Sequence, residues 1–274
     1  MVVQHNITAM NANRQLGITT GVQAKSSEKL SSGYKINRAA DDAAGLAISE
    51  KMRRQVRGLT QASANAQDGI SAVQTAEGAL NEVHDMLQRM NELSVKAGTD
   101  TLTSADRSYI QQEINALISE IDRTASTTQF NDTVLLDGTF SGKKLQVGTD
   151  ADNTSQIDIT IAKLTSSGLG INGLSVSGSN GLNGRNAIGT VKSALEMISS
   201  QRADLGAVQN RLEHTIKNLD NVTENTQAAE SQIRDTDMAA EMVRYSNNNI
   251  LAQAGQSMLA QANQTNQGVL SLLQ

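Results

Sequence analysis

Three histidines and a complete lack of cysteine limit the metal and nucleophilic chemistry open to this chain. Protein zinc sites rely on cysteine or on closely spaced histidines, whereas His5, His84 and His214 are far apart in sequence. His84 and His214 fall within two long helical patterns that could bring them close together. Histidines in a helical seam are usually structural, so we predict no metal site.

Three further patterns resemble known sites but lack the context that those sites require. Residues 168–173 match the dinucleotide motif G-x-G-x-x-G, yet Ser, Gly and Asn follow where a helix should open. Asp150 and Asp152 suggest a calcium loop, but its glycine and final glutamate are missing. Asp41 and Asp42 are paired carboxylates at an expected helix start, with no pocket around them. We predict no catalytic residues, no cofactor and no enzymatic activity.

Two long stretches, one containing His84 and the other His214, follow heptad patterns. At about 1.5 Å per residue, the helix expected over residues 43–97 is roughly 80 Å long, and its apolar stripe needs a partner of similar length. The region from Val191 to Ile233 supplies such a stripe. We predict an antiparallel coiled coil whose core contains Met52, Leu59, Val73, Leu80, Leu87, Val191, Ile198, Leu205, Leu212 and Leu219.

Between the two stripes the pattern changes twice. Thr103 and Asp106 resemble a capping box that opens a shorter amphipathic helix, which can fold back on the first. Asp137-Gly138 is a hairpin signal, and residues 143–147 and 156–161 are typical of strands. We expect a small β-element to cap the far end of the helices and a Gly/Ser/Asn loop to follow it. The loop contains candidate O-glycosylation sites at Ser166, Ser167, Ser175, Ser177 and Ser179.

Composition indicates an elongated, mostly α protein with thin helix seams. Aromatic residues make up only 2% of the 274 residues, and proline and tryptophan are absent. A formal net charge of −5 without a basic cluster argues against nucleic-acid binding. No apolar run approaches the ~20 residues of a membrane span. The first residues also lack the features of a cleavable signal peptide.

The two ends of the chain are rich in polar residues that carry no charge, such as Thr8, Asn11 and Gln15 near the start and Asn247, Gln253 and Gln256 near the end. Residues 1–36 have too few apolar positions to support an isolated helix, so we expect them to be disordered in the free chain. Residues 245–274 contain no charged side chain at all. Such tails suit burial among identical neighbours, since charges are costly to bury. The expected inner-core assembly residues are Ile7, Met10, Leu16, Ile250, Leu251, Met258, Leu259, Leu270, Leu272 and Leu273.

These patterns divide the chain into five regions. Residues 1–42 form an N-terminal inner-core segment, and residues 43–133 form the long helix with its short return helix. Residues 134–186 hold the β-hairpin element and loop. Residues 187–237 form the returning long helix, which begins near Ala187, and residues 238–274 form the C-terminal inner-core segment.

Several long strings closely resemble bacterial flagellin, the filament subunit of the flagellum. They are QHNITAMNAN at residues 4–13, LSSGYKINRAADDAAGLAI at residues 30–48, and VLSLL at residues 269–273. The resemblance covers essentially the whole chain and is to a short form without variable outer domains. It implies a homopolymeric, extracellular filament that drives motility, with termini that fold on assembly around a central export channel.

The resemblance also implies partners. Flagellins pass unfolded through a type III export apparatus, with an export chaperone, and join the filament beside cap and hook-junction proteins. A Toll-like receptor senses the family at a surface that maps here onto Gln88, Arg89, Leu93 and Glu113, with Asn91 at a position that is often basic. The main alternative is a hook–filament junction protein, which usually has a larger middle region. An unrelated coiled-coil adaptor or enzyme would leave the uncharged tail unexplained.

Overall fold

The computed structural model describes residues 6–271, with side chains as far as Gln264. The chain divides into two compact units, one made of Met1–Val56 with Glu224–Gln274 and the other of Arg57–Thr223. The prediction of a mostly helical bundle is confirmed. The α-helices of the described residues are α1 (Ile7–Ser32), α2 (Ala43–Ala97), α3 (Ser104–Thr127), α4 (Leu182–Arg234) and α5 (Met238–Ser271).

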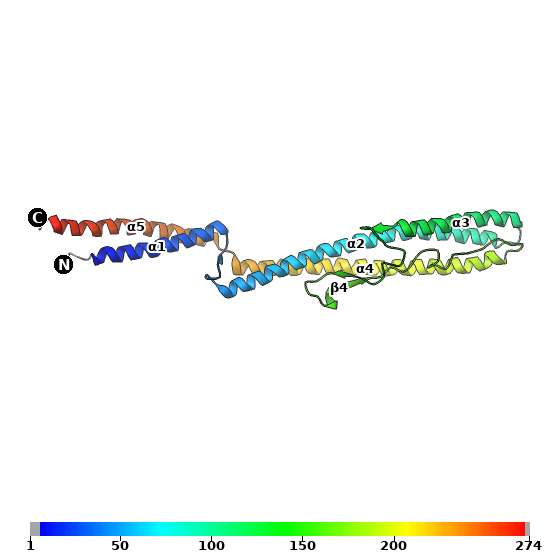
Figure 1. Ribbon diagram of the computed structural model, residues 1–274, viewed down its shortest axis with the longest axis horizontal. Coiled ribbons are helices and arrows are strands. Elements are labelled where there is room, and N and C mark those ends of the chain that lie inside the picture. Colours follow the sequence, from blue (N-terminus) through cyan, green and yellow to red (C-terminus); the bar gives the residue numbers. More distant parts are fainter. Residues whose placement is uncertain (1–5, 272–274) are drawn as a thin grey trace. The chain divides into compact units, whose positions relative to one another are not determined.

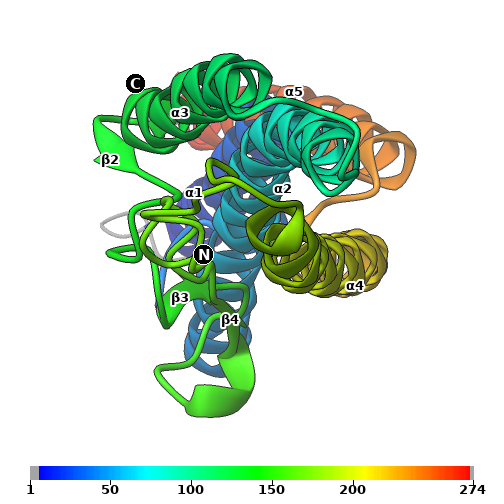
Figure 2. The same cartoon turned by 90° about the vertical axis from the view of Figure 1, so that its right-hand side faces the viewer.

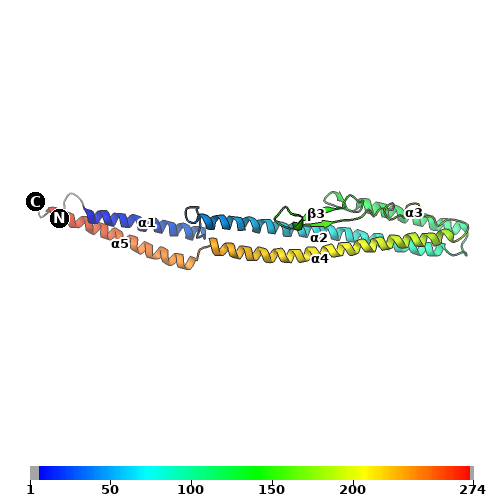
Figure 3. The ribbon, with the colours of Figure 1, turned by 90° about the horizontal axis from the view of Figure 1, so that it is seen from below.

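In the second unit, α2 and α4 lie side by side and antiparallel, as Figures 1 and 3 show. Leu59 packs with Leu219 at one level of the seam, and Ala66 packs with Leu212 at the next. Of the ten residues expected in the coiled-coil core, Met52 is half-buried and belongs to the first unit. The other nine are each at most 6% exposed: Leu59, Val73, Leu80, Leu87, Val191, Ile198, Leu205, Leu212 and Leu219.

Helix α3 folds back beside α2, as the end-on view in Figure 2 shows, and its buried residues belong to the same core cluster as those of α2 and α4. Its start is the capping box expected from the sequence: the Asp106 backbone N–H donates to the Thr103 hydroxyl, and the Asp106 carboxylate accepts from the Thr103 backbone N–H. Ile114 and Ile121 are completely buried. Tyr109 is not part of the buried face, because 69% of it is exposed.

The start of α4 meets the end of α2 in a close backbone contact. A Cβ atom on Gly184 would lie 2.5 Å from the Gly98 nitrogen, so only glycine fits there. The carboxylate of Asp100 accepts a 2.7 Å hydrogen bond from the Gly181 N–H and pairs with Arg185 at 2.6 Å. These contacts fix the start of α4 at Leu182, five residues before the expected position near Ala187.

The segment of residues 160–181 is a packed wall of the core rather than a surface loop. Its aliphatic side chains Leu164, Leu169, Ile171 and Val176 are buried in the cluster shared by α2, α3 and α4. Polar side chains of the helices bind its backbone. Asp122 accepts from the Ser166 N–H, Gln111 bonds both Val176 and Leu174, and Gln201 bonds Thr160 and Ala162. The segment contains neither helix nor strand, as expected of a loop, but its packing against the helices was not predicted.

The prediction of a hairpin turn at Asp137-Gly138 is wrong. The first strand pair is β1 (Gln129–Phe130) with β2 (Thr133–Val134), joined by Asn131-Asp132. Both turn residues have positive φ, 48° and 59°, which suits a tight hairpin turn. Asp137 instead accepts hydrogen bonds from the Thr139 N–H and hydroxyl, which makes a local turn after two leucines that enter the core.

The second strand pair, β3 (Lys143–Gln146) with β4 (Gln156–Ile159), agrees with the strands expected from the sequence to within two residues. Its position differs from the expectation. Val147 and Ile157 pack on Ala66 of α2 and Leu212 of α4. The pair therefore lies along the side of the helices, well away from the turn between α2 and α3 that ends them.

In the first unit, α1 and α5 lie side by side and antiparallel (Figure 1). Asn6 donates to the Ala262 carbonyl at one end of the pair, and Tyr34 bridges to Asp235 at the other. The expectation of disorder over residues 1–36 contrasts with a continuous α1 that ends at Ser32 and is capped by Gly33, whose φ is +76°. Residues 1–36 have too few apolar positions to support an isolated helix, but α5 supplies α1 with a partner.

Candidate functional site

The structure does not bring His84 and His214 together. His84 follows Val83, whereas His214 lies two residues from Leu212, which packs on Ala66. Eighteen residues of α2 separate these levels, or about 27 Å. His5 lies outside the described residues. Among residues 6–271, no three His, Cys, Asp or Glu side chains form a group that could hold a metal ion.

The paired carboxylates Asp41 and Asp42 have structural partners. Asp41 accepts hydrogen bonds from the backbone N–H groups of Arg38 and Asn37, and the Arg38 bond is the main cause of its lowered pKa. Asp42 accepts from the Gly45 N–H at 2.9 Å, as a helix N-cap residue does. Both carboxylates shape the turn that leads into α2.

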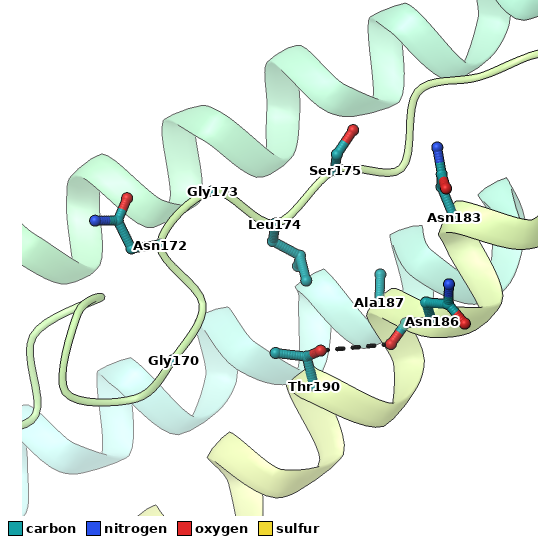
Figure 4. Close-up of a pocket in the computed structure, with 9 residues that line it drawn as sticks. All are labelled: Gly170, Asn172, Gly173, Leu174, Ser175, Asn183, Asn186, Ala187 and Thr190. Carbon is teal, nitrogen blue, oxygen red and sulfur yellow. Dashed lines mark hydrogen bonds between the residues drawn. The ribbon is translucent and has the colours of Figure 1, made fainter.

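The glycine-rich segment lines a shallow pocket of about 330 Å³ near the start of α4 (Figure 4). Gly170 and Gly173 adopt positive φ, and the next helix, α4, begins only at Leu182 and not at the third glycine. The lining contains no charged side chain, so a phosphate group would meet no cation there. Its lining residues are Gly170, Asn172, Gly173, Leu174, Ser175, Asn183, Asn186, Ala187 and Thr190.

The candidate modification sites are not equally accessible. Ser166 is 4% exposed, and its hydroxyl donates to Asp122 at 2.7 Å, so it is unavailable in the folded chain. Ser167, Ser175 and Ser179 are exposed and Ser177 is half-buried. The hydroxyls of Ser175 and Ser177 lie 3.1 Å apart.

The most distinctive surface of the described chain is the apolar one on the terminal helices. Of the expected inner-core residues, Ile7, Met10, Ile250, Leu251 and Met258 are each 58–68% exposed. Leu16 and Leu259 are half-buried. Leu270, Leu272 and Leu273 fall outside the residues whose side chains are described. The exposed set also includes Ile18, Val22, Met242 and Val243.

The seam between α1 and α5 is built from small side chains. Ser26, Ala252 and Ala262 are buried, and a Cβ atom on Gly255 would lie 3.4 Å from Leu16. Small residues let two helices approach closely but bury little apolar area. Larger aliphatic side chains such as Met10, Ile250 and Leu251 consequently remain more than half exposed.

The residues assigned to receptor recognition lie on α2 and α3. Arg89 donates to Glu113 at 2.8 Å and pairs with Glu92 at 3.0 Å, and these bonds raise the pKa of Arg89. Gln88 is exposed and bonds His84 at 2.8 Å. Leu93 is only 3% exposed, so it supports this surface from beneath.

Several polar side chains are buried inside the second unit, and the sequence did not predict them. Arg107 is 1% exposed and donates to the carbonyls of Ala97, Thr99 and Gly178. Gln201 is 8% exposed. Arg107 directly follows Asp106 of the capping box. That capping box was the only local signal in the sequence that Arg107 lies close to the turn between α2 and α3.

The fold defines a class of mostly helical proteins in which a long antiparallel pair of helices, α2 and α4, packs with the shorter α3. Two family profiles match the chain: the bacterial flagellin N-terminal helical region over residues 3–141, and the bacterial flagellin C-terminal helical region over residues 188–273. The chain therefore belongs to the bacterial flagellin family, whose members are structural proteins that polymerise into the flagellar filament outside the cell.

Individual relatives agree with this assignment. The chain is 52% identical to a flagellin of Halalkalibacterium halodurans, with all of both chains covered. It is 50% identical to a flagellin of Bacillus subtilis and 50% identical to a flagellar filament 31.3 kDa core protein of Treponema maltophilum, again over the full length of each. Because the relatives are covered completely, the short form without outer domains is confirmed.

Among solved structures, a putative flagellar hook-associated protein from Vibrio parahaemolyticus aligns with a TM-score of 0.60. The match covers 71% of this chain and all of that one, at 13% identity, and it shows a shared fold alone. Within the described residues, no helix has the length and apolar character needed to span a lipid bilayer.

Proposed function

We propose that α1 and α5 form the inner layers of the filament and surround a central channel, and that the filament drives motility. The observation that carries this proposal is the apolar surface of the terminal helices. Met10, Ile250 and Leu251 are more than half exposed on a unit whose own seam is made of small residues. Contiguous exposed apolar surface marks an association site.

The absence of charge on α5 beyond Arg244 supports the same proposal. Buried charges without partners are costly, so a helix surrounded by copies of itself favours amide and aliphatic side chains. The two helices would gain further burial only on polymerisation, and binding that favours the folded form stabilises it by mass action. Assembly would thus complete the folding of the ends.

Electron microscopy of salted-out or seeded chains tests this proposal. Chains that lack residues 1–36 or 245–274 are expected to stay monomeric, whereas the intact chain forms long filaments. The point variants Met10→Gln and Leu251→Gln are sharper, because exposed positions usually tolerate a polar side chain in the monomer to within about 0.5 kcal/mol. Both variants are expected to keep the monomer's circular dichroism and to lose polymerisation.

Met197→Gln is the matched control, since Met197 is 41% exposed on α4 in the other unit. It is expected to polymerise like the parent chain. Filaments from Leu251→Gln or from either truncated chain, in the amount given by the intact chain, would show that the terminal helices do not build the inner layers.

Export and recognition by other proteins complete the proposal. The chain leaves the cell unfolded through a type III apparatus, with an export chaperone on its C-terminal region, and joins the filament between hook-junction and cap proteins. The surface around Arg89 and Glu113 binds a host Toll-like receptor. Arg89→Ala is expected to weaken the response of receptor-expressing reporter cells to the monomer, whereas Arg123→Ala on the same unit should leave that response unchanged.

A further inference from the structure

The chain contains three Asn-Gly pairs, and the structure places them in different environments. They are Asn172-Gly173, Asn180-Gly181 and Asn183-Gly184. Asparagine is thermolabile, and a following glycine makes it more reactive, because glycine has no Cβ atom to hinder attack and adopts many backbone conformations. Whether a pair reacts in the folded chain therefore depends on what holds its side-chain amide and its glycine N–H.

The first pair is exposed, and its reacting groups are free. It forms the centre of a turn that is closed by a 3.1 Å hydrogen bond from the Leu174 N–H to the Ile171 carbonyl. Gly173 has a φ of +80°, as the third residue of a type II turn requires. Within residues 6–271, no group is hydrogen-bonded to the Gly173 N–H or to the Asn172 side chain. Figure 4 shows the pair on the bend of the segment.

The other two pairs are held in place at the start of α4. The buried Gly181 donates its N–H to the Asp100 carboxylate at 2.7 Å. Gly184 is buried within α4, and the Asn183 side-chain amide donates to the Ser177 carbonyl at 2.6 Å. Reaction at either pair requires these contacts to open first.

We infer that Asn172 is a site of spontaneous deamidation in the folded chain. The Gly173 nitrogen, after losing its proton to solvent, attacks Asn172 Cγ, and the new N–Cγ bond closes a succinimide ring. The Cγ–Nδ2 bond breaks, and the nitrogen takes up a proton from solvent and leaves as ammonia. Water then opens the ring at either carbonyl, which leaves aspartate or an isoaspartate whose backbone runs through Cβ and Cγ. The reaction consumes water, releases ammonia and changes no oxidation state.

Ring closure needs rotation about ψ of Asn172, and the fold opposes this rotation only weakly. The rotation breaks the bond between Leu174 and Ile171, and one neutral hydrogen bond changes an opening equilibrium by about tenfold at most. The bond from Gly181 to a carboxylate is stronger, and its loss also exposes buried backbone. The product would place a carboxylate on a pocket whose lining is otherwise uncharged (Figure 4). This chemistry is independent of the role proposed for α1 and α5.

Incubation of the full-length chain in mildly alkaline buffer tests the inference. Peptides from an acidic digest are fragmented in a mass spectrometer, which assigns the mass change to one asparagine, and isoaspartate is labelled with a protein-isoaspartate methyltransferase. We expect Asn172 to deamidate at least about tenfold faster than Asn180 or Asn183, since those two must first lose a hydrogen bond and packing. In guanidinium chloride, where this protection is lost, the three rates should agree to within about threefold.

Asn172→Gln is the matched control. It keeps an exposed amide at the turn, but its longer side chain would have to close a larger ring, which forms more slowly. The variant should keep the circular dichroism of the parent chain and lose the fast-forming acidic species on ion exchange. Equal conversion of the three sites in the folded parent chain would overturn the inference. So would an Asn172 that reacts only in guanidinium chloride, or a fast acidic species that persists in Asn172→Gln.

Discussion

Replacing Arg107 with methionine tests whether a buried cation holds the end of α2 to the start of α3. Its guanidinium donates to the Ala97 carbonyl at 3.1 Å and the Thr99 carbonyl at 2.8 Å, with a longer contact of 3.4 Å to Gly178. The first two carbonyls belong to the final turn of α2 and the residues after it, where the helix dipole favours a positive charge. Methionine keeps most of the apolar volume and removes all of the donors.

The expected loss can be worked from these contacts. Hydrogen bonds to a charged group contribute about 1.5–3 kcal/mol each, so the two shorter bonds contribute about 3–6 kcal/mol. Removing the guanidinium also removes the cost of burying it, which offsets part of this sum. Asp100 adds little, because it lies 3.9 Å away with a side chain that is 62% exposed. We expect a net loss of about 2–4 kcal/mol in the free energy of unfolding.

The measurement combines urea unfolding of the full-length monomer with hydrogen exchange of peptides from the turn between α2 and α3. Arg107→Lys should restore part of the loss, since one ammonium cannot bond the carbonyls with the geometry of the guanidinium fork. Arg123→Met is the surface control; its ion pair with Glu120 is exposed and contributes less than about 1 kcal/mol. If Arg107→Met unfolds like Arg123→Met, or exchange near Gly98 is unchanged, the reasoning about the buried cation fails.

Three shorter predictions concern the same unit. The Gly181 N–H, followed by Arg185, lowers the pKa of Asp100 from its ordinary 3.8, so its stabilisation is complete above that value and disappears as the pH falls through the lower folded-state pKa. The difference in urea midpoint between the parent chain and Asp100→Asn should therefore be constant near neutral pH and shrink in acid; a difference that grows in acid would contradict the sign. Leu80→Ala, at a fully buried position, should cost about 2–5 kcal/mol in thermal or urea unfolding, whereas Leu182→Ala, at a position 54% exposed, should cost under about 1 kcal/mol. Asn131→Val should cost about 1–2 kcal/mol because Asn131 has a φ of +48°, and Asn131→Gly should be nearly neutral; equal losses would show that the turn conformation is not what matters.

The long helices were predictable because their signal is periodic and repeated. Each of Leu59, Leu80 and Leu87 occupies the same face of α2, and a seven-residue repeat sustained over several turns has few alternative structures. The capping box at Thr103 was equally clear, since it joins two residue types at a fixed spacing. Both signals are local or regular, so a single sequence carries them.

The packing of the segment between α3 and α4 could not be predicted from the sequence in the same way. Gln111 and Gln201 bind backbone groups 39–65 residues away in sequence, and a glutamine in a helix does not by itself predict such a bond. The buried aliphatics Leu164, Ile171 and Val176 follow no fixed period among their Gly, Ser and Asn neighbours. The hairpin was misplaced for a related reason: Asp137-Gly138 is a good turn signal, but Leu135 and Leu136 are both buried and cannot alternate between faces as a half-exposed strand requires.

The two units differ in where their large aliphatic side chains lie, and this difference separates monomer stability from assembly. The second unit buries residues such as Leu80, Leu87 and Ile198 completely, and losing one of them should lower the stability of the monomer. The first unit buries small residues such as Ser26 and Ala252 and leaves Ile250 and its neighbours outside. Polar substitutions at those exposed positions should change the free energy of unfolding of the monomer little. They should nevertheless weaken the contacts between every pair of subunits in a polymer. We therefore expect variants of the second unit to change the unfolding midpoint of the monomer and variants of the first unit to change the critical concentration for polymerisation. If the two quantities changed together in both sets of variants, the same contacts would determine monomer stability and assembly.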